Sequence, residues 1–385
     1  MSAYPESGKK TEVIMTKDIY QKLAEHLDNM PGGFPSTESG VELRILRRLF
    51  TPEEARIALR LTLFPEEPAR VAKSLHLPVD EMARKLEDMA KKGLIYRMQA
   101  KDGPAKYMAW QYVIGIWEFH VNSLDEGLVR DMQEYMPSLM NFENWKKVPQ
   151  LRTIPINQTI PVEHAIMPYE MAEDLVRANK RILVAPCICR REKRIAGEGC
   201  DRPEETCLIF GDSADFYLKN GIGRLIDKEE ALHILKEADR TGMVLQPSNS
   251  QKIGNICLCC GCCCGVLRTI KRHPRPASII STPFRVSYEE ETCQACGICV
   301  DRCQMEALSL DGTTGGKIVV DLGRCIGCGL CFSTCPTKSM KLVRKPSTEQ
   351  PEVPTTMMKT YLKLARARGK LKPARLLKMW IRSRL

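Results

Sequence analysis

The stretches CQACGICVDRC (residues 293–303) and CIGCGLCFSTCP (residues 325–336) decide the fold of their part of the chain. Each contains the spacing C-x2-C-x2-C-x3-C, and the second run repeats the first at an offset of 32 residues. Three thiolates at three-residue spacing can wrap one face of an iron–sulfur cube. Gly297 and Gly329, each directly after the second cysteine, let the backbone bend close to the sulfurs. The two runs therefore predict two 4Fe-4S clusters.

On these runs, residues 286–343 resemble two-cluster ferredoxins. The resemblance implies two βαβ units related by a pseudo-two-fold axis, with the fourth cysteine of each run beginning a short helix and reaching the other cluster. It assigns one cluster to Cys293, Cys296, Cys299 and Cys335, and the other to Cys325, Cys328, Cys331 and Cys303. Gln304 departs from the family pattern, which has proline after the fourth cysteine. Zinc is the alternative occupant, although zinc sites usually pair two C-x2-C hooks.

The chain has 385 residues and 18 cysteines, all of them between Cys187 and Cys335. Its first residues, MSAYPESGKK, lack the apolar segment of a signal peptide, and no run approaches the length of a membrane span. Clustered cysteines in a cytosolic chain indicate metal or cluster ligation rather than disulfides. We therefore expect a cytoplasmic protein.

Ten cysteines precede the two runs. PCICRR carries two of them after an apolar stretch, and ICLCCGCCCG carries six. A third iron–sulfur cluster is the preferred interpretation, with ligands Cys187, Cys189, Cys257 and either Cys259 or Cys260, because a CxC segment after a buried strand is held rigidly. Further candidates are Cys200, Cys207, Cys262, Cys263 and Cys264. A zinc site and a redox-active dithiol or persulfide are the alternatives.

Residues 166–345 as a whole resemble a group of uncharacterised proteins from anaerobes. In that group, CxC and CxCCxCCC-like segments precede a two-cluster ferredoxin domain. The resemblance implies a cluster-binding role and no particular reaction. Arg190, Arg191, Lys193 and Arg194, which follow the CxC segment, could stabilise thiolates or an anionic cluster, or could form a solvated loop.

Residues 41–113 show helical patterns followed by a predicted hairpin. Thr51 and Pro52 predict a helix start, Gly93 predicts a helix end, and two short strands flank the turn KDGP. This order resembles winged-helix domains. The second helix of the pair, residues 79–92, carries equal numbers of acidic and basic side chains, whereas DNA binding requires a basic face. We therefore expect a packing or docking domain and do not expect DNA as a partner.

The formal net charge is +11, and residues 341–385 account for all of it with 13 Lys or Arg and 2 Glu. Apolar residues stand among these cations: Leu362, Leu364, Leu371, Leu376, Leu377, Trp380 and Ile381. The end of the chain is interpreted as a basic helical tail that docks on an acidic partner or on a membrane surface, or as a frayed solubilising tail.

Together these patterns predict an α+β multidomain protein. Its parts are a leader, a winged-helix-like domain, a central α/β cysteine-rich domain, a ferredoxin-like dicluster domain and a linker with the basic helical tail. Their expected bounds are 1–40, 41–150, 151–284, 285–345 and 346–385. No G-x-G-x-x-G nucleotide fingerprint is present.

The predicted function is electron transfer through two 4Fe-4S clusters, and a third cysteine-ligated centre, to or from a partner oxidoreductase. A carrier or subunit is favoured over a stand-alone enzyme. The alternatives are an oxidoreductase with a catalytic upstream cysteine or cluster site, and a redox-sensing winged-helix regulator.

Overall fold

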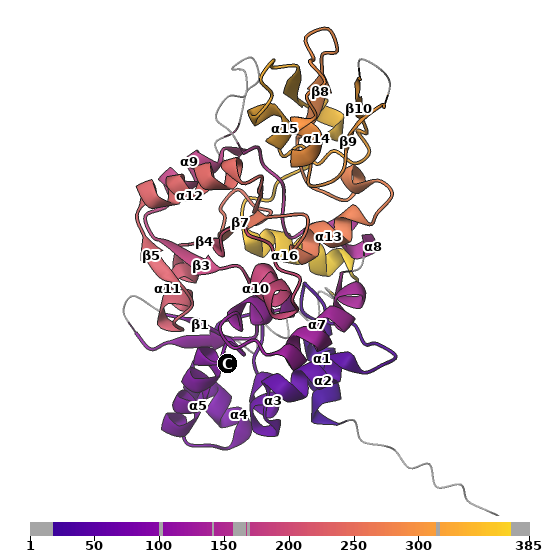
Figure 1. Ribbon diagram of the computed structural model, residues 1–385. Coiled ribbons are helices and arrows are strands. Elements are labelled where there is room, and N and C mark those ends of the chain that lie inside the picture. Colours follow the sequence, from indigo (N-terminus) through magenta and orange to yellow (C-terminus); the bar gives the residue numbers. More distant parts are fainter. Residues whose placement is uncertain are drawn as a thin grey trace, which may run out of the picture.

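The computed structural model describes residues 18–99, 103–140, 142–156, 167, 170–312 and 316–370. Figure 1 shows three stacked parts: the N-terminal helices, a central sheet with its helices, and the ferredoxin-like region (residues 285–345) at the far end. The expected α+β class is confirmed. Within the described ranges, no helix combines the length and the apolar character needed to cross a membrane.

The N-terminal part consists of helices followed by a two-stranded hairpin, in the order expected from the sequence. The elements are α1 (Ile19–Asp28), α2 (Val41–Leu49), α3 (Pro52–Ala58), α4 (Pro68–Leu75), α5 (Val79–Lys91), β1 (Tyr96–Met98) and β2 (Lys106–Met108). The start of α3 is confirmed, because the Thr51 hydroxyl accepts a hydrogen bond from the Glu54 amide and Pro52 follows it. Gly93, at φ 79°, follows α5 as expected. The winged-helix identity of this part stays a prediction.

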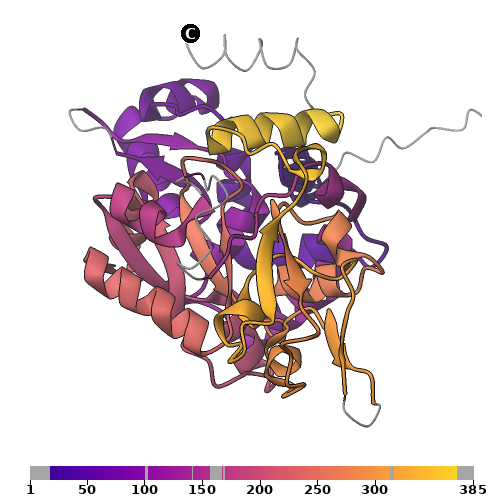
Figure 2. The same ribbon diagram turned by 90° about the horizontal axis from the view of Figure 1, so that it is seen from above.

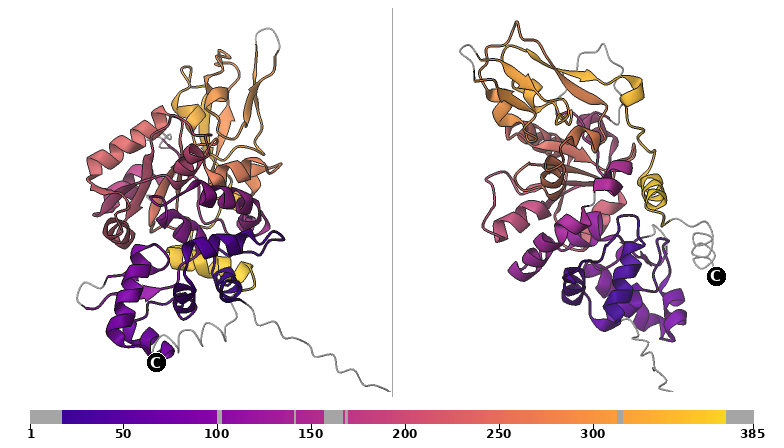
Figure 3. Two further views of the ribbon diagram at one scale, coloured as in Figure 1. Left: turned by 60° about the horizontal axis from the view of Figure 1, so that its bottom comes forward. Right: turned by 90° about the vertical axis from the view of Figure 1, so that its right-hand side faces the viewer.

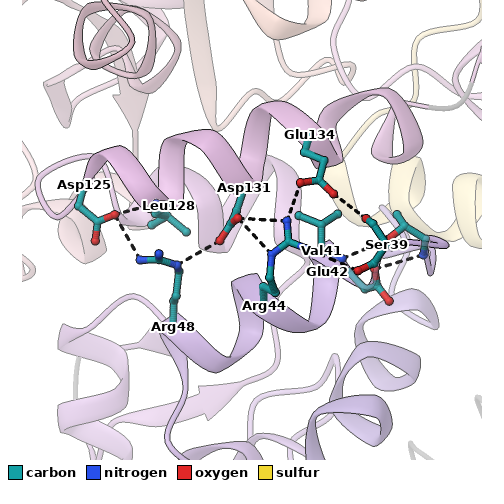
Figure 4. Close-up of polar contacts among 10 residues, drawn as sticks. Ser39, Val41, Glu42, Arg44, Arg48, Asp125, Leu128, Asp131 and Glu134 are labelled. Carbon is teal, nitrogen blue, oxygen red and sulfur yellow. Dashed lines mark hydrogen bonds and ion pairs between the residues drawn. The ribbon is translucent and has the colours of Figure 1, made fainter.

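Helix α7 (Glu126–Leu139) is fastened to α2 by a network of ion pairs, which Figure 4 shows. Arg44 pairs with Asp131 and Glu134, and Arg48 pairs with Asp125 and Asp131. The Asp131 side chain is only 7% exposed, so the two arginines compensate a carboxylate that would be costly to bury alone. Short helical segments flank α7: η1 (Tyr112–Ile116), α6 (Trp117–Phe119) and α8 (Phe142–Lys147).

The central sheet has the strand order β5-β3-β4-β7-β6, and all its pairings are antiparallel. Its strands are β3 (Ile182–Pro186), β4 (Glu205–Phe210), β5 (Arg224–Ile226), β6 (Val244–Pro247) and β7 (Asn255–Cys259). Its helices are α9 (Ala172–Ala178), α10 (Ile188–Ile195), α11 (Asp212–Lys219), α12 (Lys228–Arg240) and α13 (Gly265–Lys271). Helices and strands alternate along this region, and the α/β description of it as a separate domain stays a prediction. Hydrogen-bonded neighbours in the sheet run in opposite directions, but β4, β5 and β6, which follow one another in the chain, run the same way and are connected through α11 and α12.

Successive side chains along each strand point to opposite faces of the sheet, and different helices cover the two faces. Val184 and Leu208 pack with α9 and α12, whereas Leu183 joins the core of the N-terminal helices. Cys207 contacts the same N-terminal core, and Cys257 is its direct partner across the β4–β7 ladder. The cysteines of β4 and β7 therefore point away from α12. Residues 151–154 of the predicted crossing loop add bridges to this sheet, at Leu151 and Ile154, and residues 157–166 lie outside the described residues.

The ferredoxin-like region contains two βαβ units. Its elements are β8 (Phe284–Tyr288), α14 (Ile298–Arg302), β9 (Leu308–Leu310), β10 (Ile318–Val320), α15 (Leu330–Ser333) and β11 (Met340–Arg344). Strand β8 pairs with β11, and β9 pairs with β10. Gly297 and Gly329 precede the two helices at φ 77° and 78°, a conformation that favours glycine. One expectation is wrong: the fourth cysteine of each run follows its helix rather than beginning it, because the helix already starts after the second cysteine.

Helix α16 (Met357–Ala367) packs on the rest of the chain (Figure 2 and Figure 3). The Thr360 hydroxyl donates to the Asn249 carbonyl, and Arg368 donates to backbone carbonyls between residues 28 and 31 and to the Asp28 carboxylate. The alternative of a frayed tail is therefore wrong for residues 357–370, and docking on an acidic partner or a membrane surface stays a prediction. Leu371, Leu376, Leu377, Trp380 and Ile381 lie outside the described residues. The short segments η3 (Pro276–Ser278) and η4 (Ser347–Glu349) complete the description.

Candidate metal centres

One set of four cysteines in the ferredoxin-like region surrounds a small cavity. The cavity is lined by Cys293, Cys296, Cys299 and Cys335, and this set is the one that the resemblance assigned to one cluster. Burial and the neighbouring thiols of the set raise the pKa of Cys299 to about 11. Thiols crowded in this way cannot ionise together unless a cation compensates them, so the site fits a bound metal cluster. We call these residues the first cluster set.

The other four cysteines form the second cluster set, and Cys303 belongs to it although it comes from the first run. Burial raises the pKa of Cys331, and the nearby thiols of Cys328, Cys325 and Cys303 raise it further. Burial, followed by the thiols of Cys303 and Cys325, likewise raises the pKa of Cys328 to about 12. Cys303 therefore lies near cysteines of the second run, and the crossed ligand assignment that the resemblance implies stays a prediction.

Gln304 connects the second cluster set to the upstream cysteines. Its side-chain Oε1 accepts a hydrogen bond of 2.7 Å from the amide of Gly261, which lies between Cys260 and Cys262. The backbones approach closely here, since a Cβ atom on Gly261 would lie 2.6 Å from the Gln304 carbonyl oxygen. Proline, which the family pattern has at this position, could not accept this hydrogen bond. The departure from the pattern thus has a structural role.

The upstream cysteines separate into two groups, of which the first is the four-cysteine group: Cys200, Cys260, Cys262 and Cys263. Their sulfurs all lie within 4.8 Å of one another, a spacing that could hold a metal ion. Cys260 and Cys263 are buried and Cys262 is exposed. Burial raises the pKa of Cys200, but hydrogen bonds from the Arg202 amide and from neighbouring thiols outweigh it and lower the pKa to about 6. Only Cys260 of this group was among the preferred ligands.

The second group is a row of six thiols, here called the thiol row: Cys187, Cys189, Cys207, Cys257, Cys259 and Cys264. Three segments of the chain supply it: the turn from β3 into α10, strand β4, and residues 257–264, which run from β7 to the residue that caps α13. Neighbouring thiols shift one another's pKa along the row in the order Cys207, Cys257, Cys259, Cys264, Cys189 and Cys187. Three of the preferred ligands, Cys187, Cys189 and Cys257, thus lie in one row with Cys259.

The thiol row lines a cavity of about 580 Å³ between the sheet, the N-terminal helices and α16. Aromatic side chains form much of its remaining wall: Tyr96, Trp110, Trp117, Phe119, Phe210, Tyr217 and Tyr361. Cys260 and Cys263 of the four-cysteine group also border it. A cavity lined by six thiols from three segments is suited to a soft, thiophilic metal or cluster.

Glu118 is an acidic residue of this wall that the sequence did not indicate. Burial raises the pKa of its carboxyl to about 8, although the Gly115 amide donates a hydrogen bond of 2.6 Å to it. The carboxyl is therefore largely protonated at neutral pH and can hold a proton beside the thiol row. The available signal was a single acid within the apolar run YVIGIWEF. Tyr361 could not be anticipated, because nothing local links it to cysteines that precede it by 97 residues or more.

Of the basic residues after the CxC segment, Arg190 alone is buried against the cysteines. Its guanidinium donates to the Thr206 hydroxyl and to the Leu258 carbonyl, and its positive charge faces the thiols of Cys187, Cys260 and Cys259. Arg191 and Arg194 instead pair with Glu204, and Lys193 pairs with Glu198. One fixed cation therefore lies between the two upstream groups.

A family model described as a 4Fe-4S dicluster domain matches residues 292–339, a segment that contains both cysteine runs. No curated protein and no solved structure matches the chain. The wider resemblance over residues 166–345 and the winged-helix resemblance therefore stay predictions. Residues 292–339 form an iron–sulfur domain similar to the 4Fe-4S dicluster domains.

Proposed function

We propose that this protein transfers electrons through two 4Fe-4S clusters in the ferredoxin-like region to and from a third iron–sulfur centre held by the thiol row. The clusters supply one-electron chemistry, and the chain positions them and sets their surroundings. The match to dicluster domains supports the first two clusters. The convergence of six thiols in one cavity supports the third.

The observation that carries this proposal is a shared apolar core between the second cluster set and the thiol row. Cys303 and Cys328 pack against the same buried residues as Cys257, Cys259 and Cys264. These buried residues include Leu267, Met305, Ile326 and Leu330. The second cluster would therefore be the neighbour of the third centre, and the Gln304–Gly261 contact fixes the two regions together.

The first cluster set supports a route to an outside partner. Cys296 is exposed, whereas the cysteines of the second set are at least partly buried. Ile298, Leu310 and Val319 are apolar and each at least 41% exposed, in the helix and strands around the first set. A partner oxidoreductase would exchange electrons at this end, because the first cluster lies nearest to solvent there.

The test is to measure iron and acid-labile sulfide per chain on the full-length protein purified without oxygen. Three cubes correspond to about twelve cluster irons with equal sulfide. The double variant C189S/C257S should fall to about eight of each and lose the reduced-state EPR signal of one cluster. The matched control, C262S, should keep its cluster iron and sulfide, since Cys262 lies outside the thiol row. Equal iron and sulfide in the wild type and C189S/C257S would contradict the third centre.

A second candidate function, an oxidoreductase, is favoured by the space opposite the thiol row. The aromatic wall and the protonated Glu118 would suit a small uncharged molecule that receives electrons and a proton. An isocyanide, a small neutral ligand for iron, discriminates the two functions. If it changes the EPR signal that C189S/C257S lacks, the third centre has an open position and an enzyme is favoured. If it does not, the centre is closed and a carrier is favoured.

A further inference from the structure

The sulfur spacing in the four-cysteine group is that of ligands around one metal ion. The sulfurs are 3.5 Å apart between Cys200 and Cys263, 3.8 Å apart between Cys262 and Cys263, and 4.0 Å apart between Cys200 and Cys260. A tetrahedral ion with metal–sulfur bonds of about 2.3 Å keeps its ligands about 3.8 Å apart. The four sulfurs thus already stand close to the corners of such a tetrahedron.

The group is separate from the thiol row. Within the described part of the chain, the sulfur–sulfur contacts of the group run among Cys200, Cys260, Cys262 and Cys263, and none of these contacts reaches the six cysteines of the row. Cys200 and Cys262 do not line the cavity. The ligands come from the loop after α10 and from the turn between β7 and α13, two segments that are far apart in sequence.

The surroundings of the group suit an anionic metal–thiolate centre. Four thiolates around a divalent ion leave a net negative charge. The Arg202 guanidinium lies 3.6 Å from the Cys262 sulfur, and the positive charge of Arg190 acts on Cys260. Arg202 also donates to the Thr241 carbonyl, so its position is fixed by the end of α12.

We propose that Cys200, Cys260, Cys262 and Cys263 bind a single divalent metal ion without inorganic sulfide, in a closed tetrahedral site that holds the loop around Gly261 against Gln304. This site goes beyond the proposed electron transfer and stands without it. All four positions are taken by protein ligands, so the site is structural. By fixing Gly261, it keeps the second cluster set beside the thiol row. Zinc and a lone iron share this chemistry, and the experiment distinguishes them.

The experiment measures zinc, iron and acid-labile sulfide on full-length protein purified without oxygen. We expect about one zinc per chain, or iron that exceeds sulfide by about one. The variant C262S should lose that single ion and keep its iron–sulfur clusters, because Cys262 is the exposed member and its replacement leaves the core intact. The control C189S/C257S should keep the single ion whether or not it loses cluster iron. The result for the single-ion site can therefore be read separately from the result for the third iron–sulfur centre.

Cobalt gives a readout that does not depend on the stability of a variant. Protein produced with Co²⁺ should show the ligand-field absorption of a tetrahedral thiolate site, and C262S should lose it. The proposal is overturned if wild-type protein contains no zinc and equal iron and sulfide. It is also overturned if folded C262S retains the ion and the cobalt spectrum of the wild type.

Discussion

At Gln304 and Gly261 two distant parts of the chain meet through one hydrogen bond and one close backbone approach. The resemblance to ferredoxins identified Gln304 as a departure, but a single sequence could not show that its partner lies 43 residues earlier. Contacts of this kind depend on how distant regions pack together. The cysteine spacing within each run is local, and the sequence alone therefore predicts it.

The substitution Gly261→Ala should destabilise the protein by about 1–3 kcal/mol, because the added Cβ would overlap the Gln304 carbonyl oxygen and force the two backbones apart. Thermal unfolding of the anaerobic protein measures this. The matched control is Gly254→Ala, where the nearest atom outside the chain neighbours would be 3.8 Å from the new Cβ. Similar melting temperatures for the two variants would show that the approach at Gly261 is not tight.

The crossed ligands make a second residue-scale prediction. Cys303→Ala should damage the cluster held by Cys325, Cys328 and Cys331 more than the cluster of its own run, since Cys303 lies among those thiols. EPR of the reduced protein, with Cys335→Ala as the reciprocal control, assigns the lost signal. If Cys303→Ala removes the cluster of Cys293 and spares the other, the crossed arrangement is wrong.

Glu118 makes stability depend on pH. Its folded pKa of about 8 lies above the ordinary value of 4.5, so the folded state binds the proton more tightly. The stability that this proton supplies is complete below about pH 4.5 and is lost as the pH rises towards 8, by up to about 1.4 kcal/mol per pH unit. The thiols of Cys257 and Cys187 face the carboxyl and raise its pKa in the same direction as burial does.

Glu118→Gln cannot ionise and should therefore be free of this loss. The melting temperature of E118Q minus that of the wild type should grow between about pH 4.5 and pH 8 and then level off. Glu192, whose pKa burial raises to about 7, is present in both proteins and cancels in the difference. A difference that does not change with pH would show that Glu118 is not protonated in the folded protein.

At the scale of elements, α5 is the helix that would contact DNA if the N-terminal part were a DNA-binding winged helix. Lys85 pairs with Glu53 and Glu81, and Lys92 pairs with Glu54, so two cations of the expected recognition helix already have acidic partners within the chain. The full-length protein should therefore bind DNA only weakly, with dissociation constants of about 10⁻⁴–10⁻⁶ M or weaker that rise steeply with salt. Fluorescence anisotropy with mixed-sequence duplexes measures this. Nanomolar, sequence-specific binding at physiological salt would favour the redox-sensing regulator instead.

Several elements could be predicted from the sequence because their signals are local. The cap at Thr51, the apolar strand at residues 182–186 and the two cysteine runs are examples. Strands β4 and β7 were missed, since cysteines occupy positions where apolar or β-branched residues would have marked a strand. Once β7 is known, alternation explains why Cys257 and Cys259 share a face. The assignment of Cys200 to its group depends on a loop returning to β7, and no local pattern encodes that.

At the scale of the whole molecule, α16 completes the enclosure of the cavity. Met357 and Tyr361 line it, and the Trp110 and Tyr361 rings meet edge to face at 6.3 Å. Arg368 and Lys370 anchor the end of this segment on Asp28, at the opposite end of the sequence. The N-terminal helices, the central sheet and the C-terminal segment therefore all contribute to one site.

Removing residues 356–385 should open the cavity and cost the protein its third centre. Without α16, solvent reaches the thiol row and exposes the cluster there to loss, while the two clusters of the ferredoxin-like region keep all their ligands. Iron and acid-labile sulfide should fall from about twelve per chain to about eight. The matched control removes residues 371–385 only; it keeps α16, Arg368 and Lys370, and should retain about twelve. Loss of iron in both truncations would assign the stabilising contact to residues 371–385, and full iron in both would show that α16 does not protect the thiol row.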